Sequence, residues 1–310
     1  MAAMPGRRDR DLTARLDRIE AGLASLQRDA QAARRAADEL AAEARAARAA
    51  LADDVERLRQ ILRVVHDREP EQRERLAEVR RQPDYERAFT DPEPLVSVVI
   101  PTYDRGRLLV SRAIPSVQAQ SYPNWEMVIV GDAAPDETGQ MVAELNDPRI
   151  SYHNLTIRGP YPEAPRDLWH VAGIPPRNAA VAAAKGSWIA PLDDDDAFSP
   201  EHIATLLRAA RAQHSEVAYG LLRCLMNDGT TFNLGSFPPE YGQWGWQGSI
   251  FHGGLRFFEM ELADALFSSP GDWSLCRRML RAGVRFAMID EVVADHYESR
   301  IDPWKEQQEA

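Results

Sequence analysis

The N-terminal segment has a strict spacing of apolar residues. From Leu12 to Val65, leucine, isoleucine, valine and alanine recur at alternating steps of four and three residues, and only Asp54 interrupts the series. This is the 3.5-residue repeat of a left-handed coiled coil. We therefore expect a helix roughly 80 Å long at 1.5 Å per residue, through which copies of the chain form a homo-oligomer. The alternative is a solitary charged helix, because the alanine-rich middle of the series buries little surface.

Prolines indicate where this helix ends. Pro70 is expected to stop it, and Glu71 to Arg81 could form a second short helix before a proline-rich linker. The expected parts are a coiled-coil helix over residues 1–69, a short helix and linker over 70–94, and a folded domain over 95–310. We expect the core of that domain to be self-contained, so that a chain starting near Asp91 would fold by itself.

Beyond residue 95, short β-branched runs alternate with helical patterns. This alternation predicts an α/β domain with a mostly parallel central sheet and helices on its faces. Strands are expected at Leu95–Ile100, Trp125–Val130, Ile150–Leu155 and Ser187–Leu192, and helices at Leu108–Gln120, kinked by Pro115, at Pro176–Lys185 and at Trp273–Arg281. The sequence Asn227-Asp-Gly229 between Val217–Met226 and Thr230–Leu234 predicts a β-hairpin.

Four consecutive carboxylates, Asp193 to Asp196, follow the strand expected at Ser187–Leu192. Open α/β sheets bind ligands beyond the carboxyl ends of their strands, so these acids are expected in a cleft. Two unit charges about 4 Å apart repel by roughly 4 kcal/mol at an effective dielectric near 20, and Mg²⁺ or Mn²⁺ would relieve that repulsion. The pattern favours a metal and diphosphate site over a solvated acidic loop. A calcium EF-hand is excluded, since its sixth and twelfth positions would be Phe198 and Ala204.

Composition and charge limit the class of protein. In 310 residues, 44% are hydrophobic, which suits about two folded domains. The net charge is −11, only two lysines are present, and the acidic domain has no basic run, so nucleic acid is not an expected partner. No stretch approaches the roughly 18 apolar residues of a membrane span, and we expect a cytoplasmic protein. Cys224 and Cys276 lack metal-type spacing and are expected to be reduced core residues.

A set of short motifs occurs in an order that is similar to a known family. The motifs are Val96–Arg105, Ser116–Pro123, Val128–Asp132, Arg177-Asn178, Leu192–Asp196 and Gly271–Trp273. Over roughly residues 95 to 297 this set resembles the family 2 glycosyltransferases, which have the GT-A fold of nucleotide-diphospho-sugar transferases. Each motif alone is weak, but their order along the chain is specific.

The resemblance implies an inverting, hexosyltransferase-type enzyme that moves a sugar from a nucleotide-diphosphate sugar to an acceptor hydroxyl with the help of Mg²⁺ or Mn²⁺. By this similarity the catalytic base would be Asp272, and the late histidine His296 would reach the metal or diphosphate. The residues implied to bind the donor are Pro101, Thr102, Tyr103, Asp132, Arg177, Asp193 and Asp195, and those implied to bind the metal are Asp195, Asp196 and His296. Asp104 and Gly271 depart from the family pattern, which bears on the identity of the donor.

Other interpretations of the same residues stay open. Asp272 could instead be the N-cap of the helix over Trp273–Arg281, and Trp244 and Trp246 could stack on a sugar ring or lie buried. A glycoside hydrolase is the nearest enzymatic rival, although it needs two opposed carboxylates and no metal cluster. A coiled-coil scaffold that carries an inactive or sugar-binding domain is a further alternative. Intact acids disfavour the scaffold, and motifs of P-loop kinases, Rossmann dehydrogenases and serine hydrolases are absent from the sequence.

Overall fold

The computed structural model describes residues 7–135, 137–267 and 270–298. The chain divides into two compact units, Met1–Leu62 and Arg63–Ala310. The first unit is formed by helix α1, which spans Arg7–Val79 and thus continues into the second unit. None of the helices in the described part of the chain is both long enough and apolar enough to cross a membrane.

Helix α1 confirms the helix expected over Leu12–Val65. Its predicted apolar seam is open to solvent from Leu16 to Leu58 where the side chains are described, and Ile61 is partly buried. The side chains of Leu12, Ile19 and Val65 lie outside the described ones. The exposed fractions lie between 53% and 68% for Leu16, Leu23, Leu26, Leu40, Leu51 and Leu58. Leucines this exposed on one helix lack the burial that would stabilise a solitary chain. Pairing of the helix stays a prediction.

The expectation that Pro70 ends the helix is wrong, because α1 continues through it to Val79. All but the last two residues of the separate helix expected at Glu71 to Arg81 therefore belong to α1. A proline inside a helix removes a backbone hydrogen bond and costs about 3 kcal/mol. Contacts that the following turns make within the second unit offset this cost. Leu76 is 1% exposed, and the guanidinium of Arg73 donates to the carbonyl of Arg281 over 2.8 Å.

The second unit contains a sheet of nine strands within the described residues, in the order β3-β2-β1-β4-β8-β6-β9-β5, with β7 beside β6. The strands are β1 (Val96–Thr102), β2 (Trp125–Gly131), β3 (Ile150–Asn154), β4 (Trp188–Pro191), β5 (Ala197–Phe198), β6 (Val217–Leu225), β7 (Thr231–Leu234), β8 (Ser249–His252) and β9 (Phe286–Tyr297). Strands β1 to β4 run parallel, and the four expected strands are confirmed within two residues. The predicted hairpin is also confirmed, as β6 and β7 pair antiparallel.

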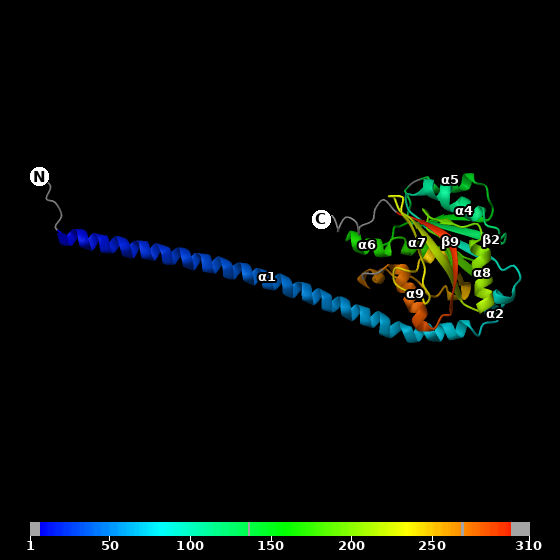
Figure 1. The fold of residues 1–310 in the computed structure, drawn as a ribbon, viewed down its shortest axis with the longest axis horizontal. Helices are drawn as coiled ribbons and strands as arrows, with labels where there is room; N and C mark the ends of the chain where they lie inside the picture. Colours follow the sequence, from blue (N-terminus) through cyan, green and yellow to red (C-terminus); the bar gives the residue numbers. More distant parts are fainter. Residues whose placement is uncertain (1–6, 136, 268–269, 299–310) are drawn as a thin grey trace. The chain divides into compact units, whose positions relative to one another are not determined.

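Helices cover both faces of this sheet (Figure 1). They are α2 (Pro83–Thr90), α3 (Gly106–Leu108), α4 (Ile114–Gln118), α5 (Thr138–Glu144), α6 (Pro165–Val171), α7 (Ile174–Ala183), α8 (His202–Gln213) and α9 (Gly271–Ala282), with short 3₁₀ turns η2 (Trp246–Gly248), η3 (Gly253–Leu255) and η4 (Leu262–Phe267). The helix expected at Leu108–Gln120 is interrupted by a π turn, η1 (Leu109–Ala113), just before Pro115. Pro115 has no N–H to donate to the preceding turn, which accounts for the irregularity.

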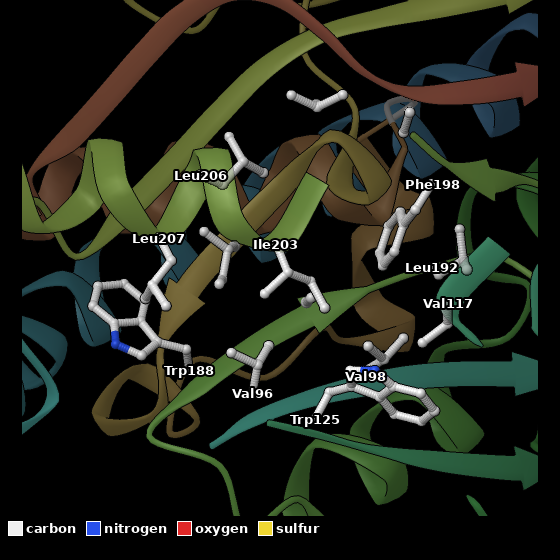
Figure 2. Close-up of a cluster of buried hydrophobic side chains, with 14 of the residues drawn as sticks. Val96, Val98, Val117, Trp125, Trp188, Leu192, Phe198, Ile203, Leu206 and Leu207 are labelled. Carbon is white, nitrogen blue, oxygen red and sulfur yellow. The ribbon is translucent and has the colours of Figure 1, made fainter. Parts of the chain in front are cut away.

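Alternate residues of the central strands fill two apolar layers, because successive strand side chains point to opposite faces. Val96, Val98 and Ile100 of β1 pack in one layer, whereas Val99 packs in the other with residues of α7 and α9. Figure 2 shows the first layer, in which Ile203 and Leu207 of α8 point toward the strand that carries Val96. The layers hold the carboxyl ends of β1, β2 and β4 in fixed register.

Helix α2 is part of this core. Phe89 lies edge-on to Trp188 with ring centroids 5.4 Å apart, and the indole nitrogen of Trp188 donates to the carbonyl of Ala88 over 3.0 Å. Tyr85, Ala88 and Phe89 are all buried in the first layer. The expectation that the core is complete from Asp91 onward is therefore wrong, since a chain starting there lacks side chains that fill it.

A buried ion network ties these N-terminal elements to the sheet. Glu216, which is fully buried, accepts hydrogen bonds from Nε of Arg80 at 2.7 Å and from the hydroxyl of Tyr85 at 2.6 Å. Arg285 donates to the same carboxylate through its backbone N–H at 2.7 Å and its guanidinium at 3.1 Å. One carboxylate thus joins the residue after α1, helix α2 and the starts of β6 and β9.

Candidate active site

The four acids lie in a turn directly after β4. The backbone N–H of Leu192 still bonds to the carbonyl of Val99 in β1, and the N–H of Asp196 reaches back to the carbonyl of Asp193. In the same register, Thr102 at the end of β1 lies beside Gly131 at the end of β2. The acids therefore sit at the edge of the sheet where the parallel strands end, which is where α/β sheets bind ligands.

Arginines meet three of these carboxylates. Arg177 of α7 donates to Oδ1 of Asp193 over 2.6 Å. Arg105 donates to Oδ2 of Asp195 and lies 3.6 Å from Asp194. Burial and repulsion between neighbouring acids outweigh these partners and raise the pKa of Asp194 to about 7 and that of Asp195 to about 6. The turn is therefore short of positive charge.

Asp196 is the most enclosed of the four and is fully buried. Its carboxylate accepts hydrogen bonds from Nε2 of Gln247 at 2.9 Å and from the backbone N–H of Tyr297 at 2.9 Å. Nδ1 of His296 in β9 lies 3.0 Å away. Burial lowers the pKa of His296, but the hydrogen bond and charge of Asp196 outweigh it and raise that pKa to about 9. Burial raises the pKa of Asp196 itself, and the hydrogen bond and charge of His296 oppose that rise.

The donor atoms in this turn suit a divalent cation that is shared with a ligand. The described residues contain no group of three or more histidine, cysteine or acidic side chains placed to hold a metal alone. Mg²⁺, however, is usually held by one or two carboxylates together with substrate phosphates. Asp195 and Asp196 offer hard oxygen ligands. Burial first and the neighbouring charge of Asp196 second raise the pKa of Asp195, and a cation would relieve the second of these.

Asp272 lies in the first turn of α9, where the charges of Arg177 and Asp193 reach it. The N-cap position belongs to Pro270, so the interpretation of Asp272 as the N-cap is wrong. Its Oδ1 accepts the backbone N–H of Trp273 over 2.7 Å. Burial raises the pKa of Asp272, while the charge of Arg177 and backbone hydrogen bonds oppose the rise. A partly buried carboxylate of raised pKa is suited to accept a proton.

The residues implied to bind the nucleoside gather at the ends of β1 and β2. Pro101 and Thr102 are the last residues of β1, and Tyr103, which follows them, is 37% exposed. Asp132 is 2% exposed and accepts a hydrogen bond from the hydroxyl of Tyr161 over 2.6 Å. Asp132 therefore fixes the loop after β3 over this edge of the sheet.

Sequence reasoning missed several side chains at this site. Arg105 belongs to a motif that was recognised, but nothing marked it as the partner of Asp195. Arg158, whose guanidinium lies 3.9 Å from the ring centroid of Tyr103, resembles any surface arginine in the sequence. Gln247 has no sequence signal either, because its role depends on the folded position of η2 beside Asp196.

One aromatic side chain near Asp272 is open to solvent. Trp244 and Trp246 are 7% and 4% exposed, so they are buried and are not available to stack on a sugar. Tyr241 is 54% exposed, and its ring lies edge-on to that of Trp273, with centroids 6.1 Å apart. An exposed aromatic ring beside the residue that follows Asp272 is placed to contact a second substrate.

Comparison with known proteins agrees with this geometry. The model of the family described as glycosyl transferase family 2 matches residues 97–161 and 174–267. The chain is 38% identical over 117 residues to the putative colanic acid biosynthesis glycosyl transferase WcaA of Escherichia coli, covering 37% of each chain. It is 33% identical over 145 residues to the succinoglycan biosynthesis protein ExoO of Rhizobium meliloti, covering 46% of this chain and 38% of that relative. The matched stretches thus span well under half of these relatives.

Solved structures support the same fold. The S. aureus TarS 1-349 structure in complex with UDP-GlcNAc is similar with a TM-score of 0.51 and 18% identity, and the alignment covers 67% of this chain and 59% of that one. Together with the sheet order and the helices on both faces, this likeness confirms the expected GT-A fold. Because the family model matches just over half of the residues, the chain belongs to glycosyl transferase family 2.

Proposed function

We propose that this chain transfers a sugar, of the hexose type, from a nucleotide-diphosphate sugar to an acceptor hydroxyl with inversion at the anomeric carbon. The observation that supports this most is the convergence of acids and arginines at one edge of the sheet. Asp193 begins the acidic turn and bonds to Arg177, and the charges of both residues act on Asp272. Groups that can hold a charged leaving group and a group that can accept a proton therefore belong to one site. TarS, of similar fold, has been solved with UDP-GlcNAc and with UDP.

In this proposal the donor diphosphate lies against the turn that carries the acids. Asp195 and Asp196 are the candidate ligands of Mg²⁺ or Mn²⁺, which supplies positive charge where the departing diphosphate becomes negative. His296 orients Asp196 through the 3.0 Å contact of its Nδ1 and opposes the rise in the Asp196 pKa that burial causes. Pro101, Thr102, Tyr103 and Asp132 are the candidate nucleoside contacts, at the ends of β1 and β2.

Asp272 is the proposed general base. It would take the proton of the acceptor hydroxyl as that oxygen attacks the anomeric carbon from the side opposite the leaving group, which inverts the configuration. Burial raises its pKa and so its basicity, and the charge of Arg177 opposes this rise. Arg177 also bonds to Asp193, so one guanidinium lies between the donor side and the base.

The relatives suggest the class of acceptor. WcaA and ExoO are named for the biosynthesis of colanic acid and of succinoglycan. We therefore infer that the acceptor is a hydroxyl of a growing bacterial polysaccharide and that the protein acts in the cytoplasm. Two free, buried cysteines, Cys224 and Cys276, suit that reducing compartment.

The experiment is an assay of nucleoside diphosphate release. The full chain is incubated with a panel of nucleotide sugars and candidate glycan acceptors, in Mn²⁺ or in chelator. Release that needs both Mn²⁺ and acceptor supports the proposal. Hydrolysis of a glycan without any nucleotide sugar would instead identify a glycoside hydrolase, and absence of turnover with measurable donor binding would favour a sugar-binding scaffold.

Two substitutions divide the roles of the carboxylates. Asp272→Asn should leave donor affinity unchanged and slow transfer by about 10² to 10⁴, since an amide cannot accept a proton. Asp196→Asn should weaken metal and donor binding together, because a neutral amide is a poorer ligand for a hard cation. Asp290→Asn removes an exposed carboxylate of β9 and is the matched control. Near-normal turnover by Asp272→Asn would remove it from the mechanism.

We also propose that α1 joins copies of the chain as a coiled coil. The exposed leucines of the first unit support this, since a second helix would bury them. Replacing Leu40 and Leu51 by Glu in the full chain should produce a monomer with an unchanged transfer rate, measured by light scattering and by the release assay. A wild-type chain that is monomeric at all concentrations tested would remove the coiled coil.

A further inference from the structure

The charged residues beside the apolar seam of α1 indicate how two copies of the helix would pair. Position g of the heptad precedes each a, position e follows each d, and residues at e and g form the ion pairs that select partner and orientation. In this notation the seam residues at position a are Leu23, Ala30, Ala37, Ala44 and Leu51, and those at position d are Leu26, Ala33, Leu40 and Ala47.

Between residues 27 and 48, the charges at these flanking positions follow a simple rule. Both charged g positions are acidic, Asp29 and Glu43, and both charged e positions are basic, Arg34 and Arg48. All four residues are exposed. Neither acid has a basic residue three or four positions away in its own helix, which is the spacing of an intrahelical pair. Their natural partners therefore lie on another helix.

A parallel pair of helices in register satisfies these charges. In such a pair each g residue faces the e residue five positions further along the other helix. Asp29 then meets the partner's Arg34, and Glu43 meets the partner's Arg48. Twofold symmetry repeats each contact, so both acids and both arginines of each copy are paired.

An antiparallel pair that overlaps the whole seam has the opposite effect. There g positions face g positions and e positions face e positions, so Asp29 lies near the partner's Glu43 and Arg34 near the partner's Arg48. Like charges at these sites destabilise the pair. The apolar stripe is also narrow over most of this stretch, because five of the seven e and g positions between residues 27 and 48 are polar, and the other two are the small residues Ala36 and Ala41. A narrow apolar stripe suits a pair of helices, because a bundle of three or more helices would bury the polar e and g positions as well.

We propose that the apolar stripe of α1 binds a second copy of this chain in parallel and in register, with Asp29–Arg34 and Glu43–Arg48 as the pairs that fix the orientation. This deepens the proposed coiled coil and rests on it. In a parallel pair the second units of both chains are joined to the same end of the coiled coil.

Disulfide trapping in the full chain tests the orientation. Ala33→Cys places a thiol at position d, where it meets its own counterpart only in a parallel, in-register pair. Burial raises the pKa of Cys224 to about 11 and that of Cys276 further, so the native thiols do not compete. We expect mild oxidation to convert Ala33→Cys into a covalent dimer, whereas the control Ala42→Cys, at the outward-facing position f, stays uncoupled.

The alternative orientation has its own signature. In the antiparallel overlap, residue 33 faces residue 44 of the other helix, so a mixture of Ala33→Cys and Ala44→Cys would form the mixed disulfide and Ala33→Cys alone would not couple. That result overturns the parallel pair while leaving the coiled coil intact. A wild-type chain that is monomeric would contradict both the parallel pair and the coiled coil. These measurements do not depend on sugar transfer, which the release assay tests separately.

Charge reversal supplies a second measurement. Glu43→Arg should raise the dissociation constant about tenfold, because it replaces two attractive contacts per dimer by repulsive ones. Adding Arg48→Glu in the same chain should restore the wild-type value, measured by sedimentation equilibrium at low salt. A double variant as weak as the single one, or a mass above that of a dimer, would overturn the proposal.

Discussion

The buried carboxylate of Glu216 is expected to hold the N-terminal elements on the catalytic unit. The perturbation is Glu216→Gln, which keeps the shape of the side chain and removes its charge. Arg80, Tyr85 and Arg285 then lose the acceptor that they share. Both arginines are left without a counter-ion, and the amide cannot accept all the hydrogen bonds that the carboxylate accepted.

The magnitude follows from the burial of each partner. Breaking a buried ion pair by removing one member costs about 3–5 kcal/mol. The side chain of Glu216 is fully buried, but those of Arg80 and Arg285 are 32% and 45% exposed, so water can solvate them in part. We therefore expect a loss of roughly 2–4 kcal/mol, which lowers the midpoint of thermal unfolding by about 5–12 °C in a unit of this size.

The stability lost in Glu216→Gln should depend on pH. Burial raises the pKa of Glu216, but hydrogen bonds from Arg80, Tyr85 and Arg285 outweigh it and hold the pKa below its ordinary value of 4.5. A carboxylate whose pKa is lower in the folded than in the unfolded chain stabilises the fold. This contribution is complete above the pKa of the unfolded chain and is lost as the pH falls through the folded-state pKa. The difference between wild type and Glu216→Gln should therefore be constant near pH 7 and shrink below about pH 4.5.

The assay is thermal denaturation followed by circular dichroism at several pH values. Glu291→Gln, which changes an exposed carboxylate in β9, is the matched control and should change the midpoint little. A shift of less than about 2 °C for Glu216→Gln at about pH 7, or a shift that stays constant down to about pH 3, would show that the network contributes less than its burial implies.

Three further results are expected. Gln247→Ala should weaken donor binding in Mn²⁺ by roughly tenfold, since Asp196 loses one of its bonds, whereas Gln247→Glu should weaken it more by adding charge beside Asp196; titration calorimetry measures both. Tyr241→Ala should raise the KM for a glycan acceptor several-fold with the donor KM unchanged in steady-state assays, while Tyr241→Phe keeps the ring and should behave as wild type. A chain starting at Arg63 should unfold at a higher temperature than one starting at Asp91, because only the former keeps Leu76, Tyr85 and Phe89; equal midpoints would contradict the role of α2.

Local patterns in the sequence predicted much of this fold. The strands that end at Thr102, Gly131 and Pro191 are short apolar runs that stop at polar residues, and such runs need no knowledge of distant contacts. The acids from Asp193 to Asp196 could be placed for the same reason, since they follow one of these runs directly. The family motifs then identified Asp272 and Arg177 as candidate residues of one site.

The remainder depends on contacts between distant segments. Pro70 looks like the end of a helix until the burial of Leu76 within the second unit is known. Helix α2 was assigned to a linker because its prolines are local signals, whereas the contact between Phe89 and Trp188 is not. Gln247 and Asp196 are distant in sequence, and no local pattern relates a glutamine to a carboxylate that far away.

The first and second halves of the segment from Gly235 to Gly248 have different roles, and this matters for redesign of the enzyme. Tyr241 faces solvent, whereas Trp246 and Gln247 bond to Asp272 and Asp196. An exchange of residues 236–243 between homologues should alter which acceptor is used and leave turnover intact. An exchange that extends through residue 247 should disable the recipient, so the graft boundary belongs before Trp244.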